Sequence, residues 1–481
     1  MDDLAERILS IDMTISSSQS MQLDLPPSCI EFCPAHPSYF LVGTYNLQKE
    51  ENEEGGAGES EAKEEEEDKE GEEGQRAQSR TGSIIVFQLL NGKARRIQTI
   101  PQPSAVFDLH FAPQPDRGDI CAAVSSTGTI SLFRLSPGRP LSITTEPEAA
   151  VLEPLSSSSL KLQDSDENTL LTYFAWHPTV PGLMAVTTAM GKVMFVQVDE
   201  GYQGIAALGT PVIEHGTEIR RGYQGVGDSE RPIIEEPIEA WCVAFSNLWD
   251  VSPESKESSL LSTVFSGGDD SALRLRSYWL AEKVEPDSNN NSNEEESDEG
   301  SNGSPVRFNL YSAKTVTGHY AGVTVILPLP ITMSDGSQLV LTGSYDDTLR
   351  AWAITPPHKN HGRPKTRILG EENLGGGVWR LKVIEELSSM AGPGPWTIVV
   401  LASCMHAGAR VLHIRGVADL KGGVEIKVLS RFEEHKSMNY GSDYSRVEGT
   451  LLRKEGKREA VCVSTSFYDR LLCVWEFEVS V

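Results

Sequence analysis

The stretch that most constrains the fold consists of two short apolar segments on either side of a tight polar turn. Leu339–Leu341 precede the turn Tyr345–Asp347, and Leu349–Trp352 follow it. Gly318-His319 lies upstream, just before a further apolar segment, Val323–Leu329. Short apolar segments bounded by polar turns are typical of antiparallel strands, so the sequence predicts a small β-sheet unit here.

The order of these features resembles the WD-repeat pattern of a β-propeller blade: Gly-His, two strands, a Ser-x-Asp turn, a third strand and Trp. In that family such residues form a buried hydrogen-bonded set that ties three strands together. The resemblance implies a structural tetrad of His319, Ser344, Asp346 and Trp352. A hydrolytic His-Ser-Asp triad is the alternative, but the Gly-x-Ser-x-Gly pentapeptide of a nucleophile elbow is absent from the sequence.

The same kind of unit recurs along the chain. Seven short apolar segments each precede a polar turn and a partner segment: Ser28–Pro34, Ala105–Pro113, Leu171–Pro178, Glu239–Phe245, Ala321–Leu327, Gly376–Val383 and Tyr440–Ser445. Without insertions each unit has about 40 residues, the usual size of a blade. The sequence therefore predicts an all-β fold, a seven-bladed WD-repeat β-propeller, with these segments as innermost strands buried on both faces.

Charge separates the predicted blades from two insertions. Residues 50–73 contain fourteen acidic residues and two lysines, and residues 285–300 contain seven acidic residues and no basic one. Together they account for −19 of the formal charge of −27. We expect disordered acidic insertions at 47–81 and 284–304, and long loops at 141–165 and 199–236.

These boundaries predict the organisation of the chain. Residues 1–46 form an N-terminal closing strand and the start of blade one, 82–283 complete blades one to four, and 305–481 form blades five to seven. Within the first range, we expect Ile8–Ile15 to be the outer strand of blade seven, because a ring with a free sheet edge would aggregate.

Composition excludes several functional classes. The chain lacks the basic surplus that direct nucleic-acid binding needs. No apolar run approaches the roughly 18 residues of a membrane span, and the N-terminus lacks the apolar region of a signal peptide. Nucleotide-binding, zinc-protease and paired Cys-x-x-Cys motifs are missing, so we expect neither a metal nor a cofactor. The seven cysteines lack disulfide spacing and indicate reduced thiols, which favours a cytoplasmic location. We expect a monomer.

Blade six departs from the repeat in a way that suggests chemistry. His406 lies six residues before Leu412, where blade five has Asp346 six residues before Trp352, so a tetrad cannot form there. The imidazole could act as a general base for water, Ser403 or Ser442, or it could merely cap the turn. The amides of Gly375, Gly376 and Gly377 could bind an oxyanion, or the glycines could simply permit a tight strand entry.

Equivalent loops should bring further side chains to the same face. They are Asp269, Tyr345, Tyr440, Tyr468 and Trp379. Aromatic rings beside a carboxylate suit a cationic ligand, including a quaternary ammonium group. Packing of the rings against the wall of the propeller is the alternative interpretation.

Several strings together resemble the WD-repeat family of diphthine methyl ester hydrolases, which also carries the label diphthine methyltransferase. They are Glu31–Pro34, Gly43–Tyr45, Glu239–Trp241, Phe265–Asp270, Gly318–Val323, Thr342–Asp347, Gly375–Lys382, Cys404–Gly408, Glu434–Asp443 and Ser466–Asp469. The resemblance spans nearly the whole chain apart from the insertions. One departure is Arg276, which stands where the fourth blade of the family has Trp.

The resemblance implies hydrolysis of the methyl ester of methylated diphthine, a modified histidine of elongation factor 2, in diphthamide biosynthesis. Elongation factor 2 would then be the partner, and the protein would lie in the cytoplasm. The residue roles proposed above come from the sequence pattern and not from the family. Two alternatives stay open: a WD-repeat scaffold without chemistry, and a peptide-binding adaptor in membrane trafficking.

Overall fold

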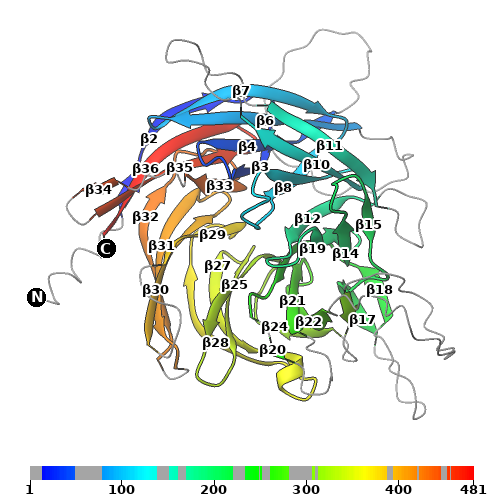
Figure 1. Ribbon diagram of the computed structural model, residues 1–481. Coiled ribbons are helices and arrows are strands. Elements are labelled where there is room, and N and C mark those ends of the chain that lie inside the picture. The colour runs from blue at the N-terminus through cyan, green and yellow to red at the C-terminus, as the bar shows by residue number, and fades with distance from the viewer. Residues whose placement is uncertain are drawn as a thin grey trace, which may run out of the picture.

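The computed structural model confirms a seven-bladed β-propeller (Figure 1). The structure describes residues 13–48, 79–137, 151–160, 169–219, 233–248, 250–251, 260–280, 306–308, 313–386, 394–419, 422–445, 452–454 and 457–480. Within these ranges, helical structure is limited to one short 3-10 turn, η1 (Pro357–Lys359). No helix in the described ranges has the length and apolar character needed to cross a membrane.

The first four blades follow the chain from inner to outer strand. Blade one contains β3 (Pro27–Phe32), β4 (Tyr39–Thr44), β6 (Ser79–Leu90) and β7 (Lys93–Gln102), with β5 (Asn46–Gln48) paired to β6. Blade two contains β8 (Val106–Phe111), β9 (Ile120–Ser125), β10 (Thr129–Ser136) and β11 (Val151–Ser159). Blade three contains β12 (Leu171–Trp176), β13 (Leu183–Thr188), β14 (Lys192–Val198), β15 (Ile205–Ala207) and β16 (Ile213–Glu214). Blade four contains β19 (Ala240–Phe245), β20 (Asp250–Val251), β21 (Leu260–Gly268), β22 (Ala272–Leu280), β23 (Val306–Phe308) and β24 (Lys314–Thr317).

Of the last three blades, the sixth and seventh each add a strand from the N-terminal part of the chain. Blade five contains β25 (Val323–Thr332), β26 (Gln338–Ser344), β27 (Thr348–Thr355) and β28 (Lys365–Asn373). Blade six contains β29 (Arg380–Glu386), β30 (Pro395–Ser403), β31 (Ala409–Val417), β32 (Val424–Phe432) and β1 (Met13–Ile15). Blade seven contains β33 (Gly441–Tyr444), β34 (Leu452–Lys454), β35 (Lys457–Ser466), β36 (Leu471–Ser480) and β2 (Ser17–Gln22). The inner strands of successive blades touch, and β33 touches β3, so the ring is closed.

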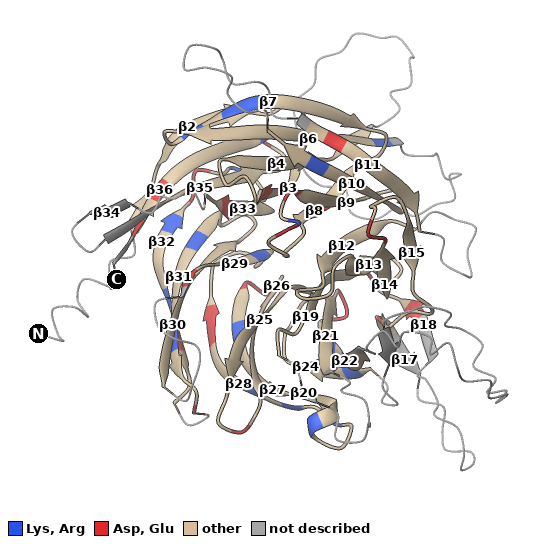
Figure 2. Cartoon of the chain, in the orientation of Figure 1, with Lys and Arg blue, Asp and Glu red and all other residues tan. Residues whose placement is uncertain are grey.

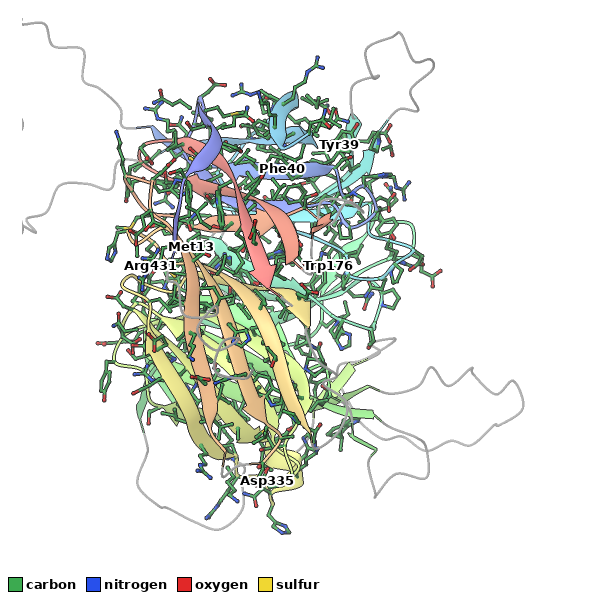
Figure 3. All side chains as sticks on the ribbon, turned by 90° about the vertical axis from the view of Figure 1, so that its left-hand side faces the viewer. Met13, Tyr39, Phe40, Trp176, Asp335 and Arg431 are labelled. Atoms are coloured by element: carbon green, nitrogen blue, oxygen red, sulfur yellow. The ribbon has the colours of Figure 1, made fainter. Side chains whose placement is uncertain are left out.

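The closing strand differs from the prediction. β2 pairs antiparallel with β36, so Ser17–Gln22, and not Ile8–Ile15, is the outer strand of blade seven. β1 pairs parallel with β32 of blade six, where Figure 3 shows Met13 close to Arg431. Residues 8–12 lie outside the described ranges. The prediction was based on apolar residues, but an outer strand is held mainly by backbone hydrogen bonds. Polar residues such as those of β2 form these bonds equally well.

The predicted loops and insertions also contain strands. The expected loop 141–165 includes β11, and the expected loop 199–236 includes β15, β16, β17 (Gly216–Ile219) and β18 (Ile233–Pro237), the last two forming a separate ribbon. Both edges of the predicted insertion 47–81 are paired, since Asn46–Gln48 lie opposite Ser79–Thr81. The rest of that insertion and the whole of the predicted insertion 284–304 lie outside the described residues.

The core lies between neighbouring blades, where buried apolar side chains interdigitate. Phe40 stacks on Phe87, and Phe432 stacks on Trp475, both with ring centroids 5.1 Å apart. Each such fully buried ring contributes about 2 kcal/mol to folding through loss of apolar surface. All seven cysteines are buried and unpaired, as the sequence predicted, and burial raises the pKa of Cys404 to about 12. They therefore pack as small apolar groups.

The prediction that the inner strands are buried on both faces is wrong in part. β3, β8 and β12 alternate between fully and partly buried positions. Successive side chains of a strand point to opposite faces, so one set packs between blades and the other lines the central channel. The channel-facing set includes charged residues, which form part of the site described below.

Candidate functional site

In blade five a buried hydrogen-bonded set fixes the turn between the second and third strands. His319 Nε2 lies 2.7 Å from Thr342 Oγ1, which also accepts a hydrogen bond of 2.7 Å from Trp352 Nε1. His319 Nδ1 lies 3.1 Å from Asp346 Oδ2, and Arg350 Nη1 donates to the same oxygen at 2.7 Å. Burial opposes ionisation of Asp346, but Arg350, the Tyr320 amide and His319 together outweigh it and lower the pKa of Asp346 to about 2.

One member of the predicted tetrad is therefore corrected: the hydroxyl belongs to Thr342 and not to Ser344. Ser344 Oγ donates to Ala321 O at 3.0 Å and accepts a hydrogen bond from Asp346 N. Ser344 is the last residue of β26, so its side chain reaches the chain entering the blade, whereas Thr342 lies deeper, level with the imidazole. No nucleophilic triad exists in this blade, because the hydroxyl beside His319 is also bound by an indole N–H.

Two other blades carry shortened versions of this set. In blade four, His215 joins Ser266 Oγ at 2.7 Å and Asp270 at 3.0 Å, without a tryptophan. In blade seven, His435 Nε2 lies 2.7 Å from Ser464 Oγ, which also accepts from an indole N–H. These sets hold the turns at one end of the propeller rigid, which is a structural role.

The turn of blade six is different. His406 is exposed, and among the described residues its imidazole makes no hydrogen bond or ring contact. Backbone hydrogen bonds hold the turn instead: Ala407 N donates to Cys404 O, and Gly408 N donates to Met405 O. Met405 has a positive φ of 42°, which a tight turn of this kind requires. The imidazole does not cap the turn and faces solvent.

Two of the three glycines lie directly against this turn. A Cβ atom on Gly376 would lie 2.3 Å from Cys404 O, and one on Gly377 would lie 2.5 Å from Met405 Sδ. Gly375 has a positive φ of 83°, and its N–H donates to Asn373 Oδ1 at 2.9 Å. The Gly375 amide is therefore occupied, whereas the Gly376 and Gly377 amides have no acceptor among the described residues.

The structure does not join the predicted serines to His406. Ser403 is buried, and its Oγ has no hydrogen-bond partner in the described part of the chain. Ser442 is also buried, and its Oγ donates to Asn439 Oδ1 at 3.1 Å. Within the described ranges, no hydrogen bond links either hydroxyl to the imidazole. The structure therefore places neither serine as a nucleophile for His406.

Aromatic rings gather around the channel at the same end of the propeller. Trp379 precedes the inner strand of blade six, and its ring centroid lies 5.8 Å from Trp241, 5.9 Å from Tyr345 and 5.0 Å from Tyr440. The start of an inner strand and the turn after the second strand lie at one end of an antiparallel blade, so these rings share a face. Each ring pair contributes about 1 kcal/mol beyond its buried area.

The cluster continues into the neighbouring blades. Phe467 contacts Tyr440 at 5.6 Å, Tyr468 at 5.1 Å and Tyr45 at 5.9 Å. Tyr45 in turn contacts Phe107 at 5.4 Å. We call this set the aromatic mouth: Tyr45, Phe107, Trp241, Tyr345, Trp379, Tyr440, Phe467 and Tyr468. Tyr468 is 68% exposed, so the mouth is open to solvent on the side of blade seven.

One carboxylate borders the aromatic mouth. A Cβ atom on Gly322 would lie 2.6 Å from Asp269 Oδ1 and 3.0 Å from the Tyr345 ring, which places these two side chains side by side. Burial raises the pKa of Asp269, and the nearby Trp241 indole acts in the opposite direction. Asp269 in turn contributes to the raised pKa of Tyr345, after burial. The structure thus brings together Asp269, Tyr345, Tyr440, Tyr468 and Trp379.

Below the aromatic mouth an ion pair crosses the channel. Arg380 Nη2 donates to Asp108 Oδ2 at 2.6 Å, and the guanidinium carbon lies 5.2 Å from the Trp379 ring and 4.7 Å from the Tyr173 ring. Burial opposes ionisation of Asp108, but Arg380, His110 and the Leu109 amide together outweigh it and lower the pKa of this carboxyl. Arg380 therefore lies between two rings with its charge neutralised.

A second layer of charged groups lies next along the same inner strands. Lys382 Nζ lies 2.6 Å from Asp443 Oδ2 and 3.6 Å from Glu31 Oε1, and His110 Nδ1 lies 2.7 Å from Glu31 Oε2. Burial lowers the pKa of His110, but Asp108 and Glu31 outweigh it and raise the pKa to about 9. Figure 2 shows charged positions on the ribbons around the centre of the ring.

The sequence analysis missed this network. The sequence did contain a sign of it: in inner segments that were interpreted as apolar, charged residues alternate with apolar ones. The two examples are Asp108 with His110, and Arg380 with Lys382. Their i, i+2 spacing places both side chains of each pair on one face of a strand. The partners of these side chains lie on other blades, and the pattern of a single strand does not show which blades those are.

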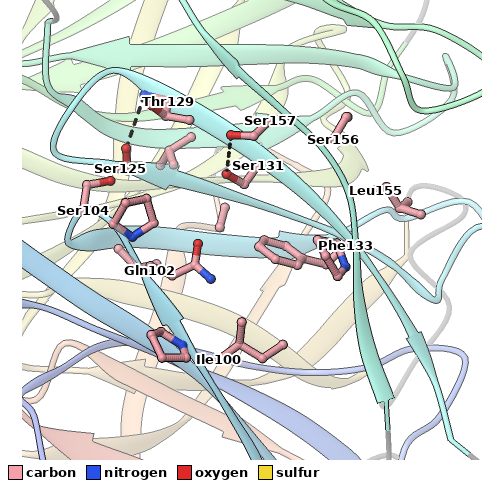
Figure 4. A pocket seen from close by; sticks show the side chains of 16 residues that line it. Ile100, Gln102, Ser104, Ser125, Thr129, Ser131, Phe133, Leu155, Ser156 and Ser157 are labelled. Atoms are coloured by element: carbon pink, nitrogen blue, oxygen red, sulfur yellow. Dashed lines mark hydrogen bonds between the residues drawn. The ribbon is translucent and has the colours of Figure 1, made fainter.

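A separate groove of about 580 Å³ lies between blades one and two (Figure 4). Phe133 and Val124 are among its apolar lining, and Ser131 and Ser157 form a hydrogen bond of 3.0 Å at its edge. None of the predicted site residues lines this groove.

Comparisons with known proteins identify one relative that matches a third of the chain and one that matches nearly all of it. A Schizosaccharomyces pombe protein named diphthine methyltransferase is 33% identical over 159 residues, which are 33% of this chain and 38% of that protein. A Dictyostelium discoideum protein named diphthine methyltransferase homolog is 22% identical over 482 residues, covering 96% of this chain and 100% of that protein. The match to the fission yeast protein thus spans less than half of that relative. No family model matches the chain.

Among solved structures, this chain is similar to Sqt1 propellers. Chaetomium thermophilum Sqt1 bound to the N-terminus of ribosomal protein L10 is 11% identical, with a TM-score of 0.48 over 96% of this chain and 100% of that one. Saccharomyces cerevisiae Sqt1 is also 11% identical, with a TM-score of 0.47 over 98% of this chain and 100% of that one.

Proposed function

We propose that this chain, like the WD-repeat diphthine methyl ester hydrolases that its sequence resembles, hydrolyses the methyl ester of methylated diphthine on elongation factor 2. The products would be methanol and the free carboxylate of diphthine. The observation that carries the proposal is the exposed imidazole of His406 on a turn that packs against Gly376 and Gly377, two glycines that lead directly into Trp379 of the aromatic mouth. A general base, amide donors and aromatic rings are groups that hydrolysis of a cationic ester would use.

The proposed reaction begins with attack of water on the ester carbonyl. His406 removes a proton from the water as the new C–O bond forms, and the carbonyl oxygen takes up the negative charge. The amides of Gly376 and Gly377 would donate hydrogen bonds to this oxyanion. Collapse of the intermediate breaks the bond to the methoxy group, which leaves as methanol with the proton from His406.

The aromatic mouth would bind the trimethylammonium group of the substrate. Aromatic faces attract such cations, and a neighbouring carboxylate adds charge attraction that a screened surface pair would lack. Asp269 supplies that carboxylate beside Tyr345. Trp379 and Tyr440 would supply ring faces from the two following blades.

A second candidate is a binding module without chemistry. The absence of a hydrogen bond between His406 and either Ser403 or Ser442 in the described residues favours it, because no nucleophile is already activated. Such a module would bind the trimethylammonium-bearing loop of the partner and leave its ester intact.

The deciding experiment incubates the purified protein, without cofactor, with methylated elongation factor 2. Release of methanol together with a loss of 14 Da from the partner, about the mass of one CH2, would support hydrolysis. Stable binding without methanol release would support the binding module. Neither binding nor release would reject both candidates.

We also propose a cytoplasmic location and a monomeric state. The seven buried, unpaired cysteines support a reducing compartment. Imaging of the tagged full-length protein and its mass by light scattering would test the two statements, and a dimer mass or an organelle-restricted signal would contradict them.

A further inference from the structure

We infer that Asp108 and Arg380 form a positioning pair that fixes Trp379 in the aromatic mouth and neutralises the charge beneath it, so that the ring can bind a cation. The inference deepens the proposed function, because it concerns the recognition of the same trimethylammonium group. It assigns a role to two residues of the central channel that touch neither the ester nor His406.

The pair joins parts of the ring that are not neighbours. Arg380 begins the inner strand of blade six, and Asp108 lies on the inner strand of blade two. Blades seven and one separate them in one direction, and blades three to five in the other. A 2.6 Å ion pair between these blades must therefore cross the channel, directly below the residue that precedes Arg380, Trp379.

Arg380 is held on several sides. Its guanidinium lies over the rings of Trp379 and Tyr173, and its Nη1 donates to Trp379 O at 3.0 Å. Asp108 is 1% exposed, and its second oxygen accepts a hydrogen bond from Leu109 N at 2.9 Å. The carboxylate is thus rigidly placed, and the planar guanidinium transmits that placement to the indole.

The charge of Arg380 would otherwise work against the proposed ligand. A cation on one face of an indole repels a second cation approaching the other face, and the water-poor surroundings screen this repulsion weakly. A carboxylate 2.6 Å from the guanidinium offsets this charge, although its oxygen also lies 3.4 Å from His110 Nε2. Asp108 therefore determines whether Trp379 attracts or repels a trimethylammonium group.

The test compares two ligands of the same shape, neither of which is an ester. Choline carries a trimethylammonium group, and 3,3-dimethyl-1-butanol carries an uncharged tert-butyl group in its place. Their dissociation constants are measured by calorimetry on the full-length protein. We expect choline to bind about tenfold more tightly than the alcohol. Equal binding of the two ligands to the unaltered protein would overturn the inference.

Three variants separate charge from placement. Asp108→Asn should weaken choline about tenfold and the alcohol less than about twofold, because it exposes the Arg380 charge. Arg380→Met should weaken both ligands, because the ring is no longer held. Arg380→Lys should restore part of both affinities relative to Arg380→Met. Equal effects of Asp108→Asn on the two ligands, or none on either, would overturn the inference.

Lys382→Met is the matched control. Lys382 lies on the same inner strand as Arg380, two residues further along, and its replacement breaks an ion pair with Asp443 of blade seven. Both affinities should stay within about twofold of those of the unaltered protein. If Asp108→Asn does not fold, the Arg380 variants decide: an Arg380→Met protein that binds both ligands as tightly as the unaltered protein overturns the inference. Neither ligand contains an ester, so this binding result does not depend on whether the protein releases methanol.

Discussion

The turns of blades five and six share a place in the fold and differ in what their side chains do. In blade five, Asp346 accepts hydrogen bonds from Arg350, Tyr320 N and Thr348 N and lies beside His319. In blade six, His406 occupies the same place and makes no such contact among the described residues. Backbone hydrogen bonds within the turn of blade six stabilise it instead.

The difference shows that blade six holds its turn without the buried side-chain set that blade five uses. Blade six keeps a fully buried interior, with Val400, Leu412 and Trp396 almost without exposure. Its turn is held by backbone hydrogen bonds and presents an exposed imidazole. On the proposed function, the turn of blade five would serve stability and that of blade six would serve chemistry.

The largest expected effect concerns activity. His406→Ala should lower methanol release by about a hundredfold or more, because the general base is lost. Its free energy of unfolding should stay within about 0.5 kcal/mol, since the side chain is exposed. Lys436→Ala, another exposed side chain on a loop at this end of the propeller, is the control and should keep full turnover. Full turnover in the His406 variant would remove the catalytic assignment.

The reverse result is expected in blade five. Asp346→Ala should lower the free energy of unfolding by about 3 kcal/mol, because it leaves Arg350 and His319 buried without their carboxylate. Urea denaturation measures the effect. A loss below about 1 kcal/mol would mean that the turn of blade five is no more structural than that of blade six.

The same carboxylate predicts a pH dependence. The pKa of Asp346 is lowered from 3.8 to about 2, so its stabilising contribution is complete above pH 3.8 and disappears as the pH falls through 2. The difference in unfolding free energy between the unaltered protein and Asp346→Asn should therefore shrink between pH 4 and pH 2. A difference that stays constant over this range would contradict the lowered pKa.

The smallest expected effect distinguishes two hydroxyl groups of blade five. Thr342→Val should cost about 2 kcal/mol, because both His319 and Trp352 lose a buried partner. Ser344→Ala should cost about 1 kcal/mol or less, since it removes a single contact at the strand end. Thermal unfolding of the two variants ranks them, and the opposite ranking would restore Ser344 to the tetrad.

Much of the fold could be predicted because it depends on local patterns. Apolar segments such as Leu171–Trp176 and turns such as Tyr345–Asp347 recur with the spacing of one blade, so the number of blades follows from counting. The N-terminal strand was misplaced because its polar residues, Ser17–Gln22, carry no apolar signal. Its pairing depends on the free edge of a strand more than 450 residues away along the chain.

Some residues of the candidate site could also be predicted from local sequence patterns, and others could not. The sequence indicated His406 by its departure from the repeat, and it indicated Tyr345, Trp379 and Tyr440 by their places in equivalent loops. It could not show that Thr342 replaces Ser344, because the choice depends on how deeply the imidazole enters the blade.

The amino-acid sequence by itself determined the architecture, the seven repeats and the departure of blade six from the turn pattern of blade five, because strand and turn preferences act over a few neighbouring residues. The tertiary structure alone decided that Asp108 of blade two meets Arg380 of blade six beneath Trp379. Closure of the ring sets the width of the channel, and only at that width can a guanidinium reach a carboxylate on a blade that is not its neighbour.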